Sequence, residues 1–409
     1  MSKTFKNDAK IIIVQNVVID HLDIAMYSGN VYMKKKKNKI FMIPHGYGKA
    51  LYKDRRLCEG EWKRGKLNGM CTIIMPGQYK YCGQYVDNYR KGPGKYISLT
   101  ETKIKSVEAE WSMNNIVGIV TIQYRNGTIY KGSIGTICYN DCGWTIRATG
   151  HGKLFLKDHS EVETIEGNWH DGIILDATIN YLNGNVYHGN VIGLTNRNGW
   201  GKLIIKSKPN EALMNPPNSE KLEFPTKYDV QKIEAEWDMN CITGKASIKY
   251  FDGSRYFGIV DIVMRRCEHG IFFYPDGTMI SGEWDRDKLI EKKMLMTKDK
   301  RRIVFNCKGT CRIHYPDKSV YYGEYDNQYR PCGRGKMKYG DGRIYNGSWW
   351  AGQKHGQGMM IQTNRDYYHG SWNHDMMHGR GIWTNYNIQS FIMQYVNNKW
   401  VTIINEYQY

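Results

Sequence analysis

A short motif of aromatic residues and glycines recurs through most of this 409-residue chain, and it constrains the fold more than any other feature. In its most regular form, Tyr345 is followed at alternate positions by Gly347 and Trp349, and after a turn by Gly356 and Gly358. Self-similarity at a period of about 20 to 50 residues is typical of repeat arrays. The motif therefore predicts a series of small, similar units in place of two or three globular domains.

The most regular of these units lie near the C-terminus. Their central glycines, Gly323, Gly347 and Gly370, are 24 and 23 residues apart. Weaker variants run back to about Tyr27, which gives roughly a dozen units in all. The residues that define the three regular units are Tyr322, Gly323, Tyr345, Gly347, Trp349, Gly356, Gly358, Tyr368, Gly370, Trp372, Gly379 and Gly381.

Each unit has the sequence properties of a β-hairpin. Alternate residues of a strand share one face, so Tyr345, Gly347 and Trp349 are expected to point the same way. The glycine leaves a gap on that face, into which a ring from the adjacent strand is expected to fit. Turn pairs such as Asp341-Gly342 supply the positive φ that tight hairpins require. Because one hairpin cannot bury its own apolar face, successive hairpins must stack.

These residues resemble the MORN (membrane occupation and recognition nexus) repeat, whose motif is close to Y-x-G-x-W-x-x-G-x-x-x-G-x-G. The match is strongest from Tyr345 to Gly358 and from Tyr368 to Gly381, and it extends in degraded form from about Tyr27 to Tyr386. The resemblance implies a twisted antiparallel sheet of hairpins with an open aromatic groove. It also implies a role in scaffolding, dimerisation, lipid binding or support of a catalytic domain. Ala109 and Ala235 replace the motif's glycine, so the groove is expected to be interrupted there.

The predicted fold is all-β, an elongated and twisted antiparallel sheet of about a dozen stacked hairpins. A Pro-rich segment separates two runs of units, and we interpret it as an insert because the same motif resumes directly after it. The charged segment from Asp285 to Phe305 could carry a short helix. The predicted organisation is an N-terminal cap at 1–23, repeats at 24–205, a Pro-rich insert or linker at 206–232, repeats at 233–385 and a C-terminal capping hairpin at 386–409.

The sequence gives no indication of an enzyme, a cofactor or a metal centre. Gly-Lys pairs such as Gly94-Lys95 lack the Ser or Thr that follows in a phosphate-binding loop. Histidines precede glycines at equivalent places in successive units, so they would be spread along the array, whereas metal ligands must converge. The ten cysteines lack paired zinc spacing. We therefore predict no catalytic, cofactor-binding or metal-binding residues.

The formal net charge of +18 suggests an anionic partner but does not identify one. Two basic runs concentrate this charge, and both are expected to lie in inserts between strands. Solvated loops are the favoured interpretation, and anion binding is the alternative. The candidate anion-binding residues are Lys34, Lys35, Lys36, Lys37, Lys298, Lys300, Arg301 and Arg302.

The favoured function is a non-enzymatic scaffold whose protein partner lies along the aromatic groove or adds to a sheet edge. The alternatives are a peripheral protein that binds anionic lipid through the basic runs, and a regulatory partner of a separate enzyme. Nucleic acid is a less favoured partner. The N-terminus lacks a signal-peptide pattern and the thiols suit a reducing compartment, which predicts a cytoplasmic location. The abundance of Lys, Asn, Ile and Tyr suggests an AT-rich coding genome, such as that of a protist or a giant virus.

Overall fold

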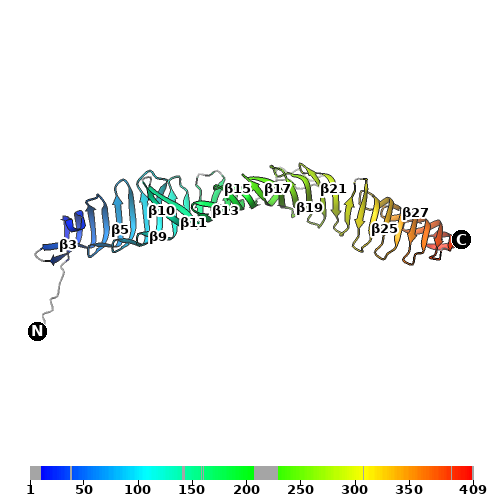
Figure 1. The fold of residues 1–409 in the computed structure, drawn as a ribbon, viewed down its shortest axis with the longest axis horizontal. Coiled ribbons are helices and arrows are strands. Elements are labelled where there is room, and N and C mark those ends of the chain that lie inside the picture. The colour runs from blue at the N-terminus through cyan, green and yellow to red at the C-terminus, as the bar shows by residue number, and fades with distance from the viewer. Residues whose placement is uncertain are drawn as a thin grey trace, which may run out of the picture. The chain divides into compact units, whose positions relative to one another are not determined.

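The structure, a computed structural model, describes residues 11–36, 39–140, 143–157, 159, 161–206, 229–306, 308–387 and 389–407. The chain divides into two units, Met1–Ser207 and Lys208–Tyr409. Most described residues are in β-strands (Figure 1), and a three-residue 3-10 helix, η1 (Asp20–Leu22), follows the first strand. The prediction of an all-β fold is confirmed. No helix among the described residues is long and apolar enough to cross a membrane.

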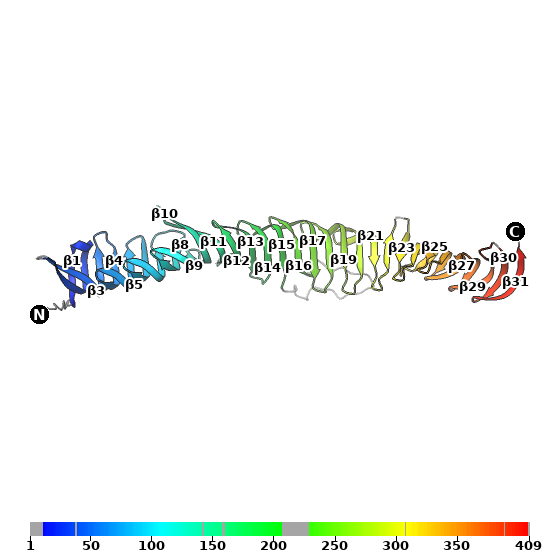
Figure 2. The ribbon, with the colours of Figure 1, turned by 60° about the horizontal axis from the view of Figure 1, so that its bottom comes forward.

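The first unit is an antiparallel meander in which each strand pairs with the next along the chain (Figure 2). Short turns connect most of these strands, so the unit is a succession of hairpins. Its strands are β1 (Ile11–Ile19), β2 (Ile24–Lys36), β3 (Lys39–Tyr52), β4 (Leu57–Lys63), β5 (Lys66–Met75), β6 (Tyr79–Val86), β7 (Tyr89–Ser98), β8 (Ile104–Ser112), β9 (Asn115–Tyr124), β10 (Ile129–Asn140), β11 (Gly143–Phe155), β12 (Val162–His170), β13 (Ile173–Tyr181), β14 (Val186–Ile192) and β15 (Asn196–Ile204).

The second unit has the same antiparallel topology, again with consecutive strands paired. Its strands are β16 (Val230–Asp238), β17 (Cys241–Tyr250), β18 (Arg255–Val260), β19 (Arg266–Phe273), β20 (Met279–Asp285), β21 (Lys288–Met296), β22 (Arg302–Phe305), β23 (Thr310–His314), β24 (Val320–Tyr325), β25 (Pro331–Lys338), β26 (Ile344–Trp350), β27 (Gln353–Ile361), β28 (Tyr367–Asn373), β29 (Met376–Thr384), β30 (Ser390–Val396) and β31 (Lys399–Tyr407).

The two faces of each sheet differ in burial, as the alternation of side chains along a strand requires. We call the face that carries the motif's first aromatic residue and its glycine the inner face, and the opposite one the outer face. On β26 the inner residues Tyr345 and Trp349 are 0% and 4% exposed, whereas the outer residue Asn346 is exposed. The predicted common orientation of Tyr345, Gly347 and Trp349 is therefore confirmed.

A pair of glycines in register on two strands of a hairpin makes room for one tyrosine ring. Gly347 on β26 faces Gly358 on β27, and a Cβ at Gly358 would lie 2.5 Å from Cζ of Tyr345. The ring that fills the gap therefore comes from the hairpin's own first strand, and the expectation of a ring from the adjacent strand is wrong. The same arrangement holds for Tyr27, Tyr81, Tyr130, Tyr187, Tyr256, Tyr321, Tyr345 and Tyr368, which we call the anchoring tyrosines.

Tyrosine burial also corrects one residue of the predicted motif. In β24 the anchoring tyrosine is Tyr321, which is 0% exposed and donates a hydrogen bond to the carbonyl of Glu324. The predicted Tyr322 is 53% exposed, because it precedes Gly323 by one residue and so points to the outer face.

Tryptophans join each anchoring tyrosine to the following hairpin. Trp372 on β28 packs edge-on against Tyr345, with 5.3 Å between the ring centroids. Its indole Nε1 donates to the carbonyl of Gly358 at 3.1 Å. Equivalent indole-to-glycine hydrogen bonds are donated by Trp62, Trp169, Trp284, Trp349 and Trp372. The unit that repeats in space thus spans two neighbouring hairpins.

Three segments singled out in the sequence differ in how the structure describes them. The segment from Asp285 to Phe305 contains strands β21 and β22 and no helix, so that expectation is wrong. The Pro-rich segment 206–232 lies largely outside the described residues, although β16 already begins at Val230. At the C-terminal end, β30 and β31 pair around a turn at Asn397 and Asn398, both with positive φ.

Candidate binding surface

The rings that define the repeat are not available to a partner. All anchoring tyrosines of the second unit are 0% exposed, and Trp349 and Trp372 are 4% and 6% exposed. Burial raises the pKa of the Tyr368 phenol to about 12, which is the expected effect of removing a tyrosinate from water. An open groove lined by these rings is therefore absent among the described residues, and binding must involve other side chains.

The outer face of the second unit carries two adjacent rows of side chains that we call the outer strip. Within each row, residues of neighbouring strands lie directly opposite one another. The first row includes the residues that directly follow the anchoring tyrosines of this unit, which are Phe257, Tyr322, Asn346 and His369. The first row is Ser247, Phe257, Ile271, Ser281, Met294, Val304, Arg312, Tyr322, Lys336, Asn346, Met359, His369, Ile382 and Ile392. The second is Lys249, Arg255, Phe273, Met279, Met296, Arg302, His314, Val320, Lys338, Ile344, Ile361, Tyr367, Thr384 and Ser390.

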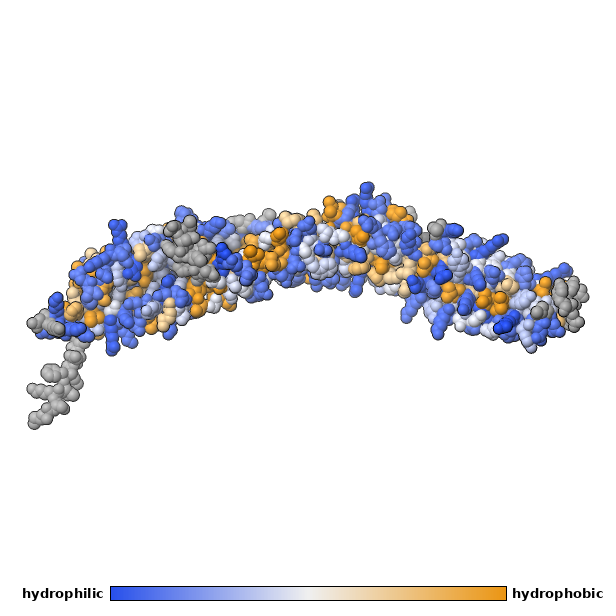
Figure 3. Space-filling model, viewed as in Figure 1, coloured by the Kyte–Doolittle hydropathy of each residue, from blue (hydrophilic) through white to orange (hydrophobic). Residues whose placement is uncertain are grey.

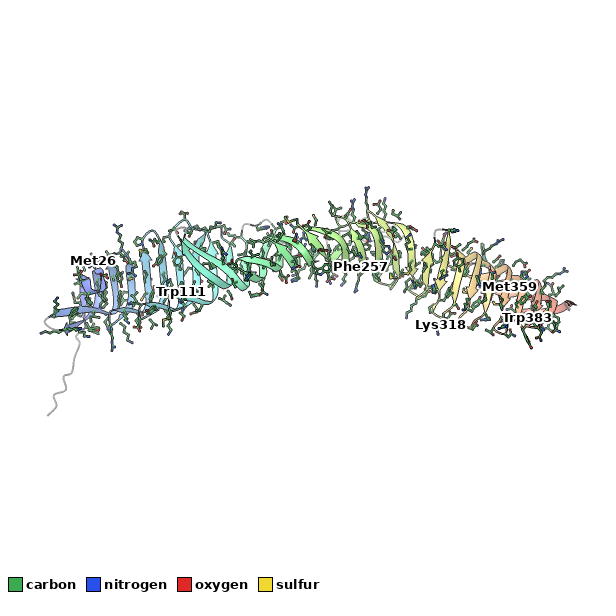
Figure 4. All side chains as sticks on the ribbon, viewed as in Figure 1. Met26, Trp111, Phe257, Lys318, Met359 and Trp383 are labelled. Carbon is green, nitrogen blue, oxygen red and sulfur yellow. The ribbon has the colours of Figure 1, made fainter. Side chains whose placement is uncertain are left out.

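Between β17 and β30 the outer strip is apolar and basic, and no carboxylate belongs to either row. On β16 the first row continues with Glu234, which lies opposite Ser247 and 2.6 Å from the amine of Lys232. Phe257 and Tyr322 are 51% and 53% exposed, and Phe273 is 39% exposed. Figure 4 labels Phe257 and Met359, which lie on strands β18 and β27. On the face of the molecule in Figure 3, apolar residues likewise form patches among hydrophilic ones. Contiguous exposed apolar surface of this kind is typical of interaction sites.

A cavity opens at the β17–β19 end of the outer strip. Its volume is about 520 Å³, and its walls combine apolar rings with one cation. The lining residues are Ser247, Gly253, Arg255, Tyr256, Phe257, Phe273, Tyr274 and Pro275. Concave sites that combine apolar rings with a few polar groups are a common form of binding site for a side chain or small ligand.

Four cations of the outer strip have no ion-pair partner among the described residues. Arg255, Arg312, Lys336 and Lys338 form no ion pair with any residue that the structure describes. Burial, and then the nearby charges of Arg302 and Arg312, lower the pKa of His314. The strip therefore has a positive potential that favours an anionic partner.

The corresponding row of the first unit is different, because acids there pair with lysines across the strands. Lys49 and Glu59 lie 2.9 Å apart, Lys95 and Glu108 2.7 Å, and Lys153 and Glu166 3.0 Å. Each pair joins directly opposite residues of neighbouring strands. These pairs neutralise three lysines of that row, whereas the outer strip between β17 and β30 has no carboxylate in either row.

The predicted anion-binding residues belong to two basic runs, one in each unit. Lys34, Lys35 and Lys36 lie within β2, near the tip of the β2–β3 hairpin, and not in an insert between strands; Lys37 is outside the described residues. Arg302 begins β22 and belongs to the outer strip. Lys298 and Lys300 lie in the turn before it.

The guanidinium of Arg301 is hydrogen-bonded within the protein, whereas a solvent-exposed side chain was expected in this basic run. Its Nε donates to a carboxylate oxygen of Asp299 at 2.8 Å, and its Nη1 donates to the carbonyl of Tyr329 at 3.2 Å. These contacts tie the turn to a neighbouring hairpin. Arg301 is therefore a structural residue, and we remove it from the candidate anion site.

No group of three or more His, Cys, Asp or Glu side chains that could hold a metal ion occurs among the described residues. Desolvation raises the pKa of the buried Cys58 and Cys311 thiols to about 12, so both remain protonated and are poor nucleophiles. Cys142 and Cys307, each half of a closely spaced cysteine pair, lie outside the described residues.

Comparison with known proteins identifies MORN repeats at four places in this chain, residues 58–76, 81–98, 345–367 and 368–387. The last two segments include the strongest motifs, and the first two begin in β4 and β6 of the first unit. The chain therefore contains MORN repeats, and the resemblance predicted from its motifs is confirmed. A comparison with curated proteins finds no match.

Three solved structures are similar to parts of the chain. The TCP10 domain of Danio rerio CPAP in complex with a STIL peptide is 9% identical, with a TM-score of 0.22, and the match covers 71% of this chain and 99% of that one. A point mutant of that domain is 9% identical, with a TM-score of 0.23 and coverages of 67% and 100%. The Drosophila melanogaster SAS-4 TCP domain, in complex with a proline-rich motif of Ana2, is 12% identical, with a TM-score of 0.12 and coverages of 63% and 88%. Scores this low carry no argument about function.

Proposed function

We propose that this MORN-repeat chain is a non-enzymatic scaffold that binds a protein partner on the outer face of its second unit. MORN repeats suggest protein or membrane interaction in general. The observation that carries the specific proposal is the outer strip, where half-exposed rings and cations lie in two rows that have no carboxylate between β17 and β30. The anchoring tyrosines are buried on the opposite face, whereas Phe257, Phe273 and Tyr322 of the strip are 51%, 39% and 53% exposed.

The extent of the strip favours a polypeptide over a small ligand. Its rows run from β17 to β30, and neighbouring strands lie about 4.8 Å apart, so each row measures roughly 60 Å along the sheet. A small molecule would contact only the few strands around the cavity. A polypeptide could engage aromatic, methionine and arginine side chains, which are the types enriched at protein interfaces.

Co-purification from native cells with strip variants tests this proposal. The variant Phe257→Ser, Tyr322→Ser, Met359→Ser removes apolar side chains from the strip, and Ile119→Ser, Leu175→Ser removes exposed apolar side chains from the first unit. We expect a specific partner to be lost with the first variant and retained with the second. Partners that both variants retain would contradict the proposal, provided that circular dichroism shows both to be folded.

A second candidate function, binding to an anionic membrane, is favoured by the tip of the β2–β3 hairpin. Lys35 faces Ile40 and Lys36 faces Lys39 there, and Ile40 is 64% exposed. Each lysine near an anionic surface would contribute about 1 kcal/mol, and salt would weaken the attraction.

Flotation with vesicles that contain phosphatidylserine tests the membrane candidate. Replacement of Lys34, Lys35, Lys36 and Lys39 by Gln should abolish flotation at low salt if the hairpin tip binds lipid. Unchanged flotation of this variant would exclude the tip as the lipid-binding site.

A further inference from the structure

We infer that the partner segment bound by the outer strip is an acidic amphipathic helix, an inference that rests on the proposed scaffold function and specifies its ligand. Three properties of the strip lead to this class of partner. They are its unpaired cations, its deformable apolar side chains and the spacing of its strands.

The charge of the strip requires acidic residues in the partner. Arg312 on β23 lies opposite Tyr322 on β24, which in turn lies opposite Lys336 on β25, so cations flank an exposed ring. Lys338 follows in the second row of the same strand. Because no carboxylate of the strip neutralises these groups, carboxylates of a partner can form charge-assisted hydrogen bonds with them, whereas a basic partner would be repelled.

The apolar part of the strip requires apolar side chains between those acids. Four methionines, Met279, Met294, Met296 and Met359, lie in the two rows. Methionine is unbranched and polarisable, so such a surface adapts to the side chains of a helix. The cavity beside Phe257 and Phe273 can receive one larger apolar residue, which is the usual arrangement of an anchoring hot spot.

Strand spacing favours a helix that lies along the rows. An α-helix advances about 5.4 Å per turn, whereas neighbouring strands lie about 4.8 Å apart, so successive turns meet successive strands with a small mismatch. An extended chain repeats its side-chain direction only every 6.6 Å or so and loses this correspondence within a few strands. The two rows are separated by two residues along a strand, about 7 Å, which matches the apolar stripe of one helix.

The inference is tested with three synthetic helical peptides that share the same pattern of apolar residues. Each peptide is titrated with the full chain, and binding is measured from the fluorescence anisotropy of the peptide. One probe carries Leu at helical spacing with Glu elsewhere, a second has Gln in place of Glu, and a third has Lys. We expect the Glu probe to bind, and the Gln and Lys probes to bind at least tenfold more weakly. Equal binding of the Glu and Gln probes would overturn the inference.

Charge reversal separates the strip from the general positive charge of the chain. The strip variant is Arg312→Glu, Lys336→Glu, Lys338→Glu, and the control Lys80→Glu, Lys131→Glu, Lys202→Glu makes the same change in net charge on the outer face of the first unit. The strip variant should weaken the Glu probe by roughly tenfold or more, and the control by less than about threefold. Equal loss in both would show non-specific attraction and overturn the inference.

Two further outcomes distinguish this inference from the proposed function. A natural partner that depends on the strip but presents no acidic helix would overturn the inference and leave the scaffold function intact. Displacement of the Glu probe from the chain by phosphatidylserine vesicles, together with the absence of any protein partner that depends on the strip, would overturn both the inference and the scaffold function.

Discussion

The smallest structural element of this protein is one tyrosine ring lying over two glycines. Tyr345 fills the space above Gly347 and Gly358, and its hydroxyl donates to the carbonyl of Ser348 at 3.0 Å. The glycines are required because a Cβ at Gly347 would lie 2.6 Å from Oη of Tyr345. At position 233 an aliphatic residue, Ile233, replaces the tyrosine. In that hairpin the two glycine positions are occupied by Ala235 and Ala246.

Replacement of Gly347 by Val should destabilise the second unit by about 1–3 kcal/mol or more, because the new side chain and the Tyr345 ring need the same space. The matched control is Asn346→Val, which adds the same side chain at the exposed neighbouring position and should change stability by less than about 0.5 kcal/mol. Denaturant titrations measure both. Equal effects of the two changes would mean that the glycine is not required for steric reasons.

Burial of the phenols predicts a loss of stability at alkaline pH. Desolvation raises the pKa of Tyr187 and Tyr368 from the ordinary value of 10 to about 12. The unfolded chain releases these protons near pH 10 and the folded chain only near pH 12. The stabilisation is therefore complete below pH 10 and is lost as the pH rises through 12.

Ultraviolet absorbance of tyrosinate and circular dichroism, followed together, measure this loss. We expect a large part of the tyrosinate signal to appear cooperatively with unfolding between pH 10 and 12. Complete titration of all tyrosines near pH 10 with unchanged circular dichroism would contradict the account.

The sequence predicted which residue types build the repeat, but it could not always choose between neighbours. Tyr321 and Tyr322 are both followed by Gly323 within two positions, and only the period-2 rule with the register of β24 identifies Tyr321 as the buried one. No motif in the sequence marks Lys354 as buried, yet its amine lies 5.0 Å from the Trp372 ring centroid and its side chain is 12% exposed. Such contacts between hairpins have no local sequence pattern.

At the level of elements, each hairpin is joined to the next by an indole. Trp349 on β26 donates to the carbonyl of Gly335 on β25 and packs edge-on against Tyr321, with ring centroids 5.4 Å apart. A tryptophan of one hairpin thus covers the tyrosine of the preceding one. This explains how tyrosine rings in a single layer of sheet become fully buried.

Replacement of Trp349 by Phe tests this junction because it keeps an aromatic ring but removes the Nε1 donor. The partly buried carbonyl of Gly335 then lacks this donor, and we expect a loss of about 1 kcal/mol or more in stability. Trp350, the next residue, is 61% exposed, so Trp350→Phe is a matched control with little expected effect. Thermal melts that do not separate the two variants would contradict the proposed role of the indole.

The hairpin succession could be read from the turn pairs and glycine spacing, but the Asp285–Phe305 segment could not. Lys288–Met296 is rich in Lys, Leu and Met, residues that favour a helix in isolation. In the structure it pairs with β20 on one side and β22 on the other, and these ladders override local propensity.

At the scale of the whole chain, the two units have the same topology but different outer faces. The first unit neutralises three lysines of its outer row with glutamates, whereas Arg255, Arg312, Lys336 and Lys338 of the second unit form no ion pair with any described residue. The net charge of +18 could be counted from the sequence. The distribution of this charge over the outer faces could not, because successive members of each row are 6 to 18 residues apart and are aligned only by strand register.

The central claim, that the outer strip of the second unit contacts a protein partner, is tested most directly by site-specific photo-cross-linking. A photoactivatable methionine analogue at position 359, on the strip, is compared with one at position 26, on the outer face of the first unit (Figure 4). We predict a cross-linked protein at position 359 and none at position 26, with loss of the adduct in the Arg312→Glu, Lys336→Glu, Lys338→Glu variant. A partner that co-purifies but cross-links only at position 26, or at position 359 regardless of the charge reversal, would contradict the claim.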